Sequence, residues 1–197
     1  LTVTAPFSGK LLDVASIEAG QSVSSGTKIA TLVDDSSMKL SLYFSYAYEK
    51  QIYVGQTAQI SIPSTMSSLT GKVSKINKVS YISPEGAVFF EVVFTVSNPN
   101  NLTADMEATA VLSSGGEAIY PYNGGKLQYA RTQDIVTKVG GDAISVNLLN
   151  YNKVSAGMTL LKMSGDDNDE QIAALETQME TAQENLKKAE ENLKNFN

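Results

Sequence analysis

The chain carries the same short pattern twice, once at its start and once near its end. Segment 3–14 (VTAPFSGKLLDV) matches segment 135–146 (IVTKVGGDAISV) at an offset of 132 residues, and segment 23–32 (VSSGTKIATL) matches segment 154–163 (VSAGMTLLKM) at an offset of 131. Each copy predicts a strand, a glycine turn, a second strand and a final hairpin of the form V-x-x-G-x-x-[IL]. A unit this small cannot bury its apolar face alone, so each copy is expected to pair with another half.

Glycines are predicted to shape the turns of both copies. Gly26 and Gly157 occupy equivalent positions and should take the positive φ that a tight hairpin requires. The full set of predicted structural turns is Gly9, Gly20, Gly26, Gly141 and Gly157. We hypothesise that residues 1–35 and 135–165 close one sandwich, either within one chain or between two chains.

Between the two copies lies a second region with the period-two alternation of β-strands. In its clearest strand, alternate residues from Val88 to Val96 are apolar, and in an earlier strand Leu40, Leu42 and Phe44 share one face. About five antiparallel strands without crossover helices favour a small barrel or a sandwich.

From residue 169 onward the pattern changes to apolar residues at helical spacing, without Gly or Pro. The spacings alternate between three and four, as in the a/d stripe of a coiled coil, and Asp167 with Glu170 predicts a capping box at the helix start. No second helix of this length is predicted, so the partner must be a return arm outside the chain or another copy. The stripe comprises Ile172, Leu175, Met179, Ala182, Leu186, Ala189, Leu193 and Phe196. The residues expected to carry assembly are Ile172, Leu175, Met179, Leu186 and Leu193.

The composition excludes several kinds of chemistry. The chain has neither His nor Cys, so Ser-His and Cys-His catalysis, thiol redox chemistry and zinc sites built on these ligands are ruled out. A formal charge of −6 without a Lys/Arg stripe argues against nucleic acid as a partner. Any enzyme of this composition would have to rely on carboxylates, Lys, Tyr, Ser or Thr. Because Leu1 is not an initiator Met, the chain is interpreted as a piece of a longer protein, with any membrane anchor outside this piece.

Nearly the whole chain resembles the bacterial membrane fusion proteins, the HlyD-type periplasmic adaptor subunits of secretion and efflux transporters. Its C-terminal block looks like the lipoyl half that leads into the coiled-coil hairpin of this family. Segment 3–9 (VTAPFSG), followed by Gly20, Val23 and Gly26, looks like the lipoyl-like half-motif that follows the α-hairpin of this family. Segments 38–46 and 52–56 look like the opening of its β-barrel. Segment 102–106 departs from the family pattern, because Asp105 stands where a Gly often precedes the Met.

The resemblance implies a fold, a division of the chain and a function. The fold would be mainly β, with a small antiparallel β-barrel, lipoyl-like or biotinyl-like half-motifs and a C-terminal coiled-coil helix. The parts would be a first half-motif at 1–36, the barrel at 37–113, a second half-motif at 114–166 and the start of a helical hairpin at 167–197. The function would be structural and non-catalytic, without a cofactor or a metal. The protein would be an adaptor that self-associates into a ring and couples an ABC-type or RND-type membrane transporter to efflux or secretion, on the extracytoplasmic face of the bacterial cytoplasmic membrane.

The order of the parts is unusual for this family. Its members normally run half-motif, hairpin, half-motif, barrel, whereas here the half that should follow a hairpin comes first. Either the full protein contains two lipoyl-hairpin modules in tandem, or the two outer halves of this piece complement each other.

Other readings of single residues remain open. Lipoyl-like folds also carry biotin or lipoate on a lysine, which makes Lys39 and Lys162 candidates in the accessory domain of a multi-enzyme complex, although neither lies between two matching halves. The acidic run 166–170 fits helix capping better than a calcium loop, because it lacks the central Gly of an EF-hand. A further possibility is a surface binding module with a sugar platform built from Tyr43, Tyr46, Tyr48 and Tyr53.

Overall fold

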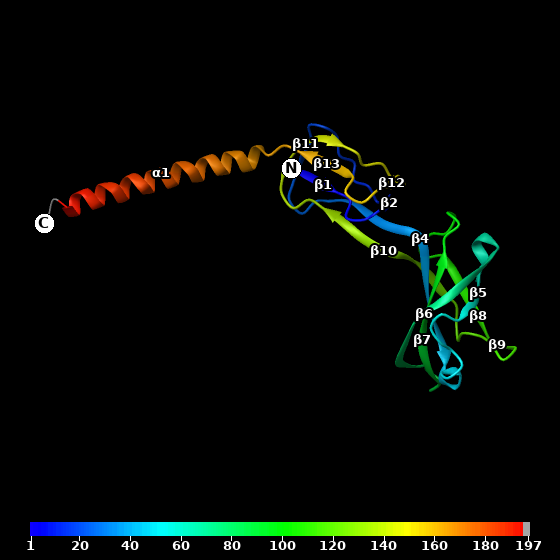
Figure 1. The fold of residues 1–197 in the computed structure, drawn as a ribbon. Helices are drawn as coiled ribbons and strands as arrows, with labels where there is room; N and C mark the ends of the chain where they lie inside the picture. Colours follow the sequence, from blue (N-terminus) through cyan, green and yellow to red (C-terminus); the bar gives the residue numbers. More distant parts are fainter. Residues whose placement is uncertain (195–197) are drawn as a thin grey trace.

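The structure of the chain is a computed structural model. It describes the backbone of residues 1–194 and the side chains of residues 1–165 and 172–189. Within these residues the protein is mainly β, with two antiparallel sheets followed by one α-helix at the C-terminal end (Figure 1).

The smaller sheet has four strands and is built from both copies of the repeat. Its strand order is β1-β13-β11-β3, so strands from the start of the chain lie on either side of strands from its end. Their bounds are β1 (Thr2–Thr4), β3 (Ser22–Val23), β11 (Gly141–Val146) and β13 (Thr159–Met163).

The larger sheet has nine strands and is ring-like. The order β10-β8-β5-β6-β7-β4 returns to its start because β10 also pairs with β4, and β2 and β12 continue the sheet beyond β4. The bounds are β2 (Gly9–Leu12), β4 (Lys28–Ser45), β5 (Thr57–Ile62), β6 (Ser67–Ile82), β7 (Val88–Ser97), β8 (Glu107–Ser114), β9 (Glu117–Ile119), β10 (Gly125–Val136) and β12 (Lys153–Val154), with short 3-10 turns η1 (Tyr46–Tyr48) and η2 (Pro63–Thr65).

The prediction of a small β-barrel is wrong, because the sheet is ring-like but is not a barrel. β10 meets β8 through two residue pairs, Gly125 with Ala108 and Lys126 with Glu107. Beyond that contact, β10 and β4 leave the ring together as a paired ribbon that ends at the pairing of Val136 with Lys28. A continuous barrel would need a full ladder at this seam.

The buried apolar side chains form two hydrophobic clusters, which define two bodies. The ring body (residues 36–130) packs inward-facing side chains of its strands around Phe44, Phe90 and Phe94, all fully buried. The repeat body (residues 1–35 and 131–165) has a separate cluster to which both copies of the repeat contribute: Ala5, Leu11, Val23, Ile29, Ala30, Leu32, Ile135, Ala143, Val154, Leu160, Leu161 and Met163. The hypothesis that the two copies close on each other is confirmed within one chain by the pairings β1–β13, β3–β11 and β2–β12.

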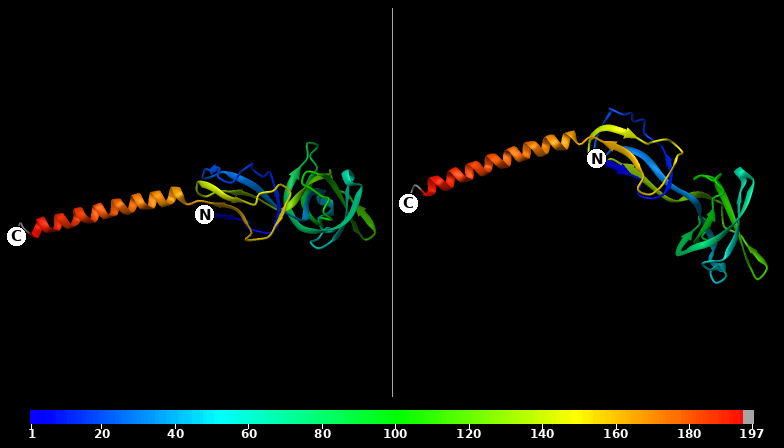
Figure 2. Two further views of the ribbon diagram at one scale, coloured as in Figure 1. Left: turned by 90° about the horizontal axis from the view of Figure 1, so that it is seen from above. Right: turned by 45° about the horizontal axis from the view of Figure 1, so that its top comes forward.

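The helix α1 (Asp166–Lys194) follows the repeat body and projects away from it (Figures 1 and 2). In each view α1 extends from the end of the repeat body that is far from the ring body. None of the described elements lies alongside it.

Candidate functional site

The predicted assembly stripe lies on the exposed face of a free-standing helix. Ile172, Leu175, Met179 and Leu186 are 52%, 63%, 60% and 61% exposed. Every side chain described between residues 172 and 189 is exposed. The helix therefore presents an apolar seam that no described part of the chain covers. The side chain of Leu193, those of Asp167 and Glu170 in the predicted cap, and the whole of Phe196 lie outside the described residues.

Polar contacts along α1 are local and weak. Lys188 lies 3.9 Å from Glu184 one turn earlier, and the hydroxyls of Thr177 and Thr181 donate to the carbonyls of Ala173 and Thr177 at 2.9 Å. An exposed pair at this spacing contributes about 0.3–0.5 kcal/mol. These contacts support helical geometry but do not compensate for the exposure of the stripe.

The start of the chain lies at the base of this helix. The backbone N–H of Leu1 donates to the carbonyl of Met163 at 2.8 Å, and the N–H of Met163 donates back to the carbonyl of Leu1 at 2.8 Å. Because α1 begins at Asp166, a polypeptide running into Leu1 would arrive beside the first turn of the helix (Figure 1).

A groove of about 550 Å³ opens at the same end of the repeat body, between β1 and β10. Its walls include apolar side chains such as Val3, Ile135 and Val139, with Asp134 and Lys138 beside them. The ammonium of Lys28 at 2.8 Å, helped by the hydroxyl of Thr31, holds the pKa of Asp134 below its usual range. The charges at the groove are thus partly paired.

The predicted turn glycines occupy turns and close approaches in the repeat body. Gly26 and Gly157 both have φ of +80°, so the repeat extends to backbone conformation, as expected for equivalent hairpin turns. Gly20 also has a positive φ, and Gly141 lies at the start of β11. Gly9 serves a different purpose, because a Cβ there would overlap the carbonyl oxygen of Val33 on β4.

Neither candidate lysine lies at a hairpin tip. Lys39 is in the middle of β4, and its ammonium donates to the carbonyl of Ala130 at 2.7 Å. Lys162 is an exposed residue of β13, paired with Thr2 on one side and Ser145 on the other. A carrier lysine must swing between distant sites, whereas these two positions belong to ladder interiors.

The four tyrosines singled out from the sequence do not form one surface. The hydroxyl of Tyr46 donates to the carbonyl of Lys78 at 2.7 Å, and its ring packs edge-on against Phe90 at 5.3 Å. Tyr48 is half-buried, whereas Tyr53 is exposed in a loop. Only Tyr43 joins a wider aromatic group.

That wider group was not predicted from the sequence. The rings of Tyr43 and Tyr81 lie 4.9 Å apart, Tyr81 and Phe89 lie 6.4 Å apart, and Phe89 and Tyr122 lie 4.5 Å apart. The carboxylate of Glu85 next to Tyr122 raises the pKa of that phenol. The available signal was the placement of Tyr81 and Phe89 on the two sides of one hairpin turn, where they pair directly, but the position of Tyr122 depends on long-range folding.

Catalytic and metal-binding constellations are not found among the described side chains. No three of their acidic residues approach closely enough to hold a metal ion. Among the described residues, no helix has both the length and the apolar character needed to cross a membrane.

Comparison with known proteins gives no independent assignment: no protein-family model matches the chain, and no curated protein matches it.

Proposed function

We propose that the chain is part of a non-enzymatic extracytoplasmic adaptor, a membrane fusion protein of the HlyD type, which couples an ABC-type or RND-type transporter to efflux or secretion. In this proposal the repeat body is a complete lipoyl-like module made from two half-motifs, and the ring body is the counterpart of the adaptor β-barrel. The mechanism is geometric, and no residue performs chemistry.

One observation carries the proposal: a long helix with an exposed apolar stripe rises from a body that both copies of the repeat build together. Leu1 lies beside the base of that helix through its paired hydrogen bonds with Met163. In the proposed adaptor, a helical arm that precedes Leu1 in the full protein enters the repeat body there, runs antiparallel to α1 and covers the stripe. This arrangement gives the exposed seam of Leu175, Met179 and Leu186 a partner, as coiled-coil packing requires.

The ring body and α1 then lie at opposite ends of one elongated unit. Several such units side by side, with arms projecting in one direction, would form the ring of adaptors that the proposal includes. Membrane anchoring would come from outside this piece.

The carrier-domain alternative receives less support. Lys39 donates to a carbonyl of the neighbouring strand, and Lys162 lies within a ladder, so neither offers a mobile attachment point. The mass of the protein purified from its native host tests this alternative directly, because biotin or lipoate would add a defined increment to one lysine.

The decisive experiment is in-cell cross-linking of the full-length protein, followed by mass spectrometry of the proteins that co-purify from membranes. Recovery of a transporter permease is expected. Recovery of soluble carboxylase or dehydrogenase subunits in its place would overturn the proposal.

A pair of variants tests the role of the stripe in the same assay. Leu186→Asp places a charge in the seam, and Thr177→Asp places the same charge on the opposite face of α1. Leu186→Asp should reduce the assembly and the permease yield, whereas Thr177→Asp should leave both unchanged. Equal yields from the two variants would count against a role of α1 in assembly.

A further inference from the structure

The junction between the two bodies contains an irregularity in β4. On β10, Tyr129 pairs with Met38 and Arg131 pairs with Asp34, so a step of two residues on β10 opposes a step of four on β4. The two additional residues of β4 lie within segment 35–37. A bulge of this kind bends and twists a two-stranded ribbon, and here the ribbon of β4 and β10 is what joins the bodies.

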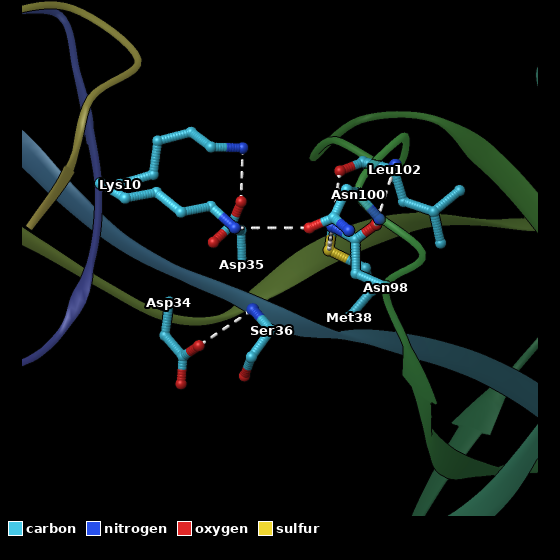
Figure 3. Close-up of polar contacts among 9 residues, drawn as sticks. Lys10, Asp34, Asp35, Ser36, Met38, Asn98, Asn100 and Leu102 are labelled. Atoms are coloured by element: carbon cyan, nitrogen blue, oxygen red, sulfur yellow. Dashed lines mark hydrogen bonds and ion pairs between the residues drawn. The ribbon is translucent and has the colours of Figure 1, made fainter.

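An ion pair is buried at this bulge. The carboxylate of Asp35, 8% exposed, contacts the ammonium of Lys10 on β2 (Figure 3). The neighbouring Asp34 points away from this pair and accepts a hydrogen bond from the N–H of Ser36 at 3.0 Å. The side chain of Ser36 and, second to it, this N–H lower the pKa of Asp34. Within the described residues, Lys10 is therefore the cation that compensates Asp35.

A loop of the ring body reaches the same place from the other side. The N–H of Asn98 donates to the carbonyl of Ser36 in the bulge at 3.1 Å. The side-chain oxygen of Asn98 accepts from the N–H groups of Asn100 and Leu102 at 2.9 and 3.0 Å, which holds the loop in a fixed shape. Asn100, with φ of +78°, then presents its side-chain oxygen to the ammonium of Lys153 at 3.4 Å.

The two lysines are direct cross-strand partners, since Lys153 on β12 pairs with Lys10 on β2. Like charges directly opposite each other destabilise a ladder. Both lysines instead extend toward the junction. The ammonium of Lys10 contacts the carboxylate of Asp35, and that of Lys153 contacts the side-chain oxygen of Asn100. The repeat body thus directs two adjacent positive charges at acceptors on the bulge and on the ring body.

We propose that two contacts form a clasp that fixes the angle between the repeat body and the ring body: Lys10–Asp35 holds the start of the bulge of β4 against the repeat body, and Lys153–Asn100 crosses from the repeat body to the ring body. Opening the clasp lets the ribbon bend at the bulge. The clasp lies on one side of the ribbon, which is the geometry that restrains bending. This inference concerns the conformation of the chain and does not depend on the adaptor proposal.

The test measures the distance between the bodies in the full chain. The chain has no cysteine, so Thr70→Cys on the ring body and Ile144→Cys on the repeat body, both exposed, provide two specific sites for spin labels. Pulsed electron paramagnetic resonance should give one narrow distance distribution for the labelled parent.

Variants at the exposed half of the clasp remove the contact without disturbing a core. Lys153→Ala removes one ammonium, and Asn100→Gly removes the acceptor while tolerating the positive φ. Both should broaden the distribution and shift its mean, and Asp35→Asn should do so more strongly. Lys162→Ala, the control, removes an exposed lysine of the same body away from the junction and should leave the distribution unchanged.

Distributions for Lys153→Ala and Asn100→Gly that coincide with that of the parent would overturn the clasp, as would a parent distribution already as broad as theirs. Circular dichroism of each labelled protein separates loss of the fold from loss of the angle. If Asp35→Asn does not fold, the two exposed variants still decide the question.

Discussion

The β part of the molecule and its helix treat their apolar side chains in opposite ways. The strands bury Phe44, Phe90 and Phe94 completely, whereas α1 leaves Leu175 and Leu186 more than half exposed. The apolar faces of the strands pack against one another within the chain, whereas no described part of the chain covers the heptad stripe. The β bodies are therefore expected to be stable as they stand, and the helix to be completed by a partner.

The largest expected effect is in the core of the ring body, which buries its own apolar side chains. Phe94→Ala empties a fully buried site in the ring body and should lower the free energy of unfolding by about 3–5 kcal/mol. Thr95→Ala, on the same strand but facing outward, is the control and should change it by less than about 1 kcal/mol. Chemical denaturation followed by circular dichroism measures both, and equal losses would show that the ring body has no dominant core.

A second effect concerns the repeat body, where Gly9 and Gly26 serve different purposes. Gly9→Ala should cost about 1–3 kcal/mol, because its Cβ would overlap the carbonyl of Val33 in a paired strand. Gly26 has open space around it, so its requirement is only the positive φ. Gly26→Asn should therefore be nearly neutral in denaturation, since Asn tolerates that conformation, whereas Gly9→Asn should be at least as harmful as Gly9→Ala. A rescue of Gly9 by Asn would contradict the steric explanation.

The parts of this fold that could be predicted from the sequence are those with local periodicity. The alternation in 88–96 and the heptads after residue 169 correspond to β7 and α1, and the internal repeat predicted the pairing of distant segments. Asp105, where a Gly was expected from the resemblance, takes φ of +68°, in the left-handed region that Gly adopts freely and Asp tolerates.

Long-range registers could not be predicted in this way. Whether the strands close into a barrel depends on the seam between β8 and β10, which two residue pairs decide. The clasp depends on a bulge in β4 that brings Asp35 to Lys10, and periodicity carries no information about a register shift. The aromatic group around Phe89 likewise requires Tyr122 to arrive from a distant loop.

A smaller effect distinguishes paired surface charges of the repeat body from the buried groups. Lys28 and Thr31 lower the pKa of Asp134 below its usual value of 3.8. The ionised carboxylate therefore contributes its full stabilisation at pH values above the pKa that Asp134 has in the unfolded chain. This contribution is lost as the pH falls through the lower, folded pKa. Asp134→Asn should therefore reduce the melting temperature slightly at neutral pH, and the difference from the parent should vanish in strong acid. A difference that persists there would mean that Asp134 acts by shape rather than by charge.

The smallest expected effect is at Leu186, and it sharpens the comparison most. At low protein concentration, Leu186→Ala should change the free energy of unfolding of this chain by no more than about 0.5 kcal/mol, because the side chain is exposed and Ala is an equally good helix former. Thr177→Ala on the opposite face is the matched control. Raising the concentration separates the two possible partners of the stripe: a loss that grows with concentration in Leu186→Ala alone means that α1 pairs with another copy. If Leu186→Ala does not lower the free energy of unfolding at any concentration but impairs assembly of the full-length protein, the stripe pairs with a helical arm outside this chain. Leu186 is thus expected to have little effect on the stability of the β bodies and a large effect on the pairing of α1.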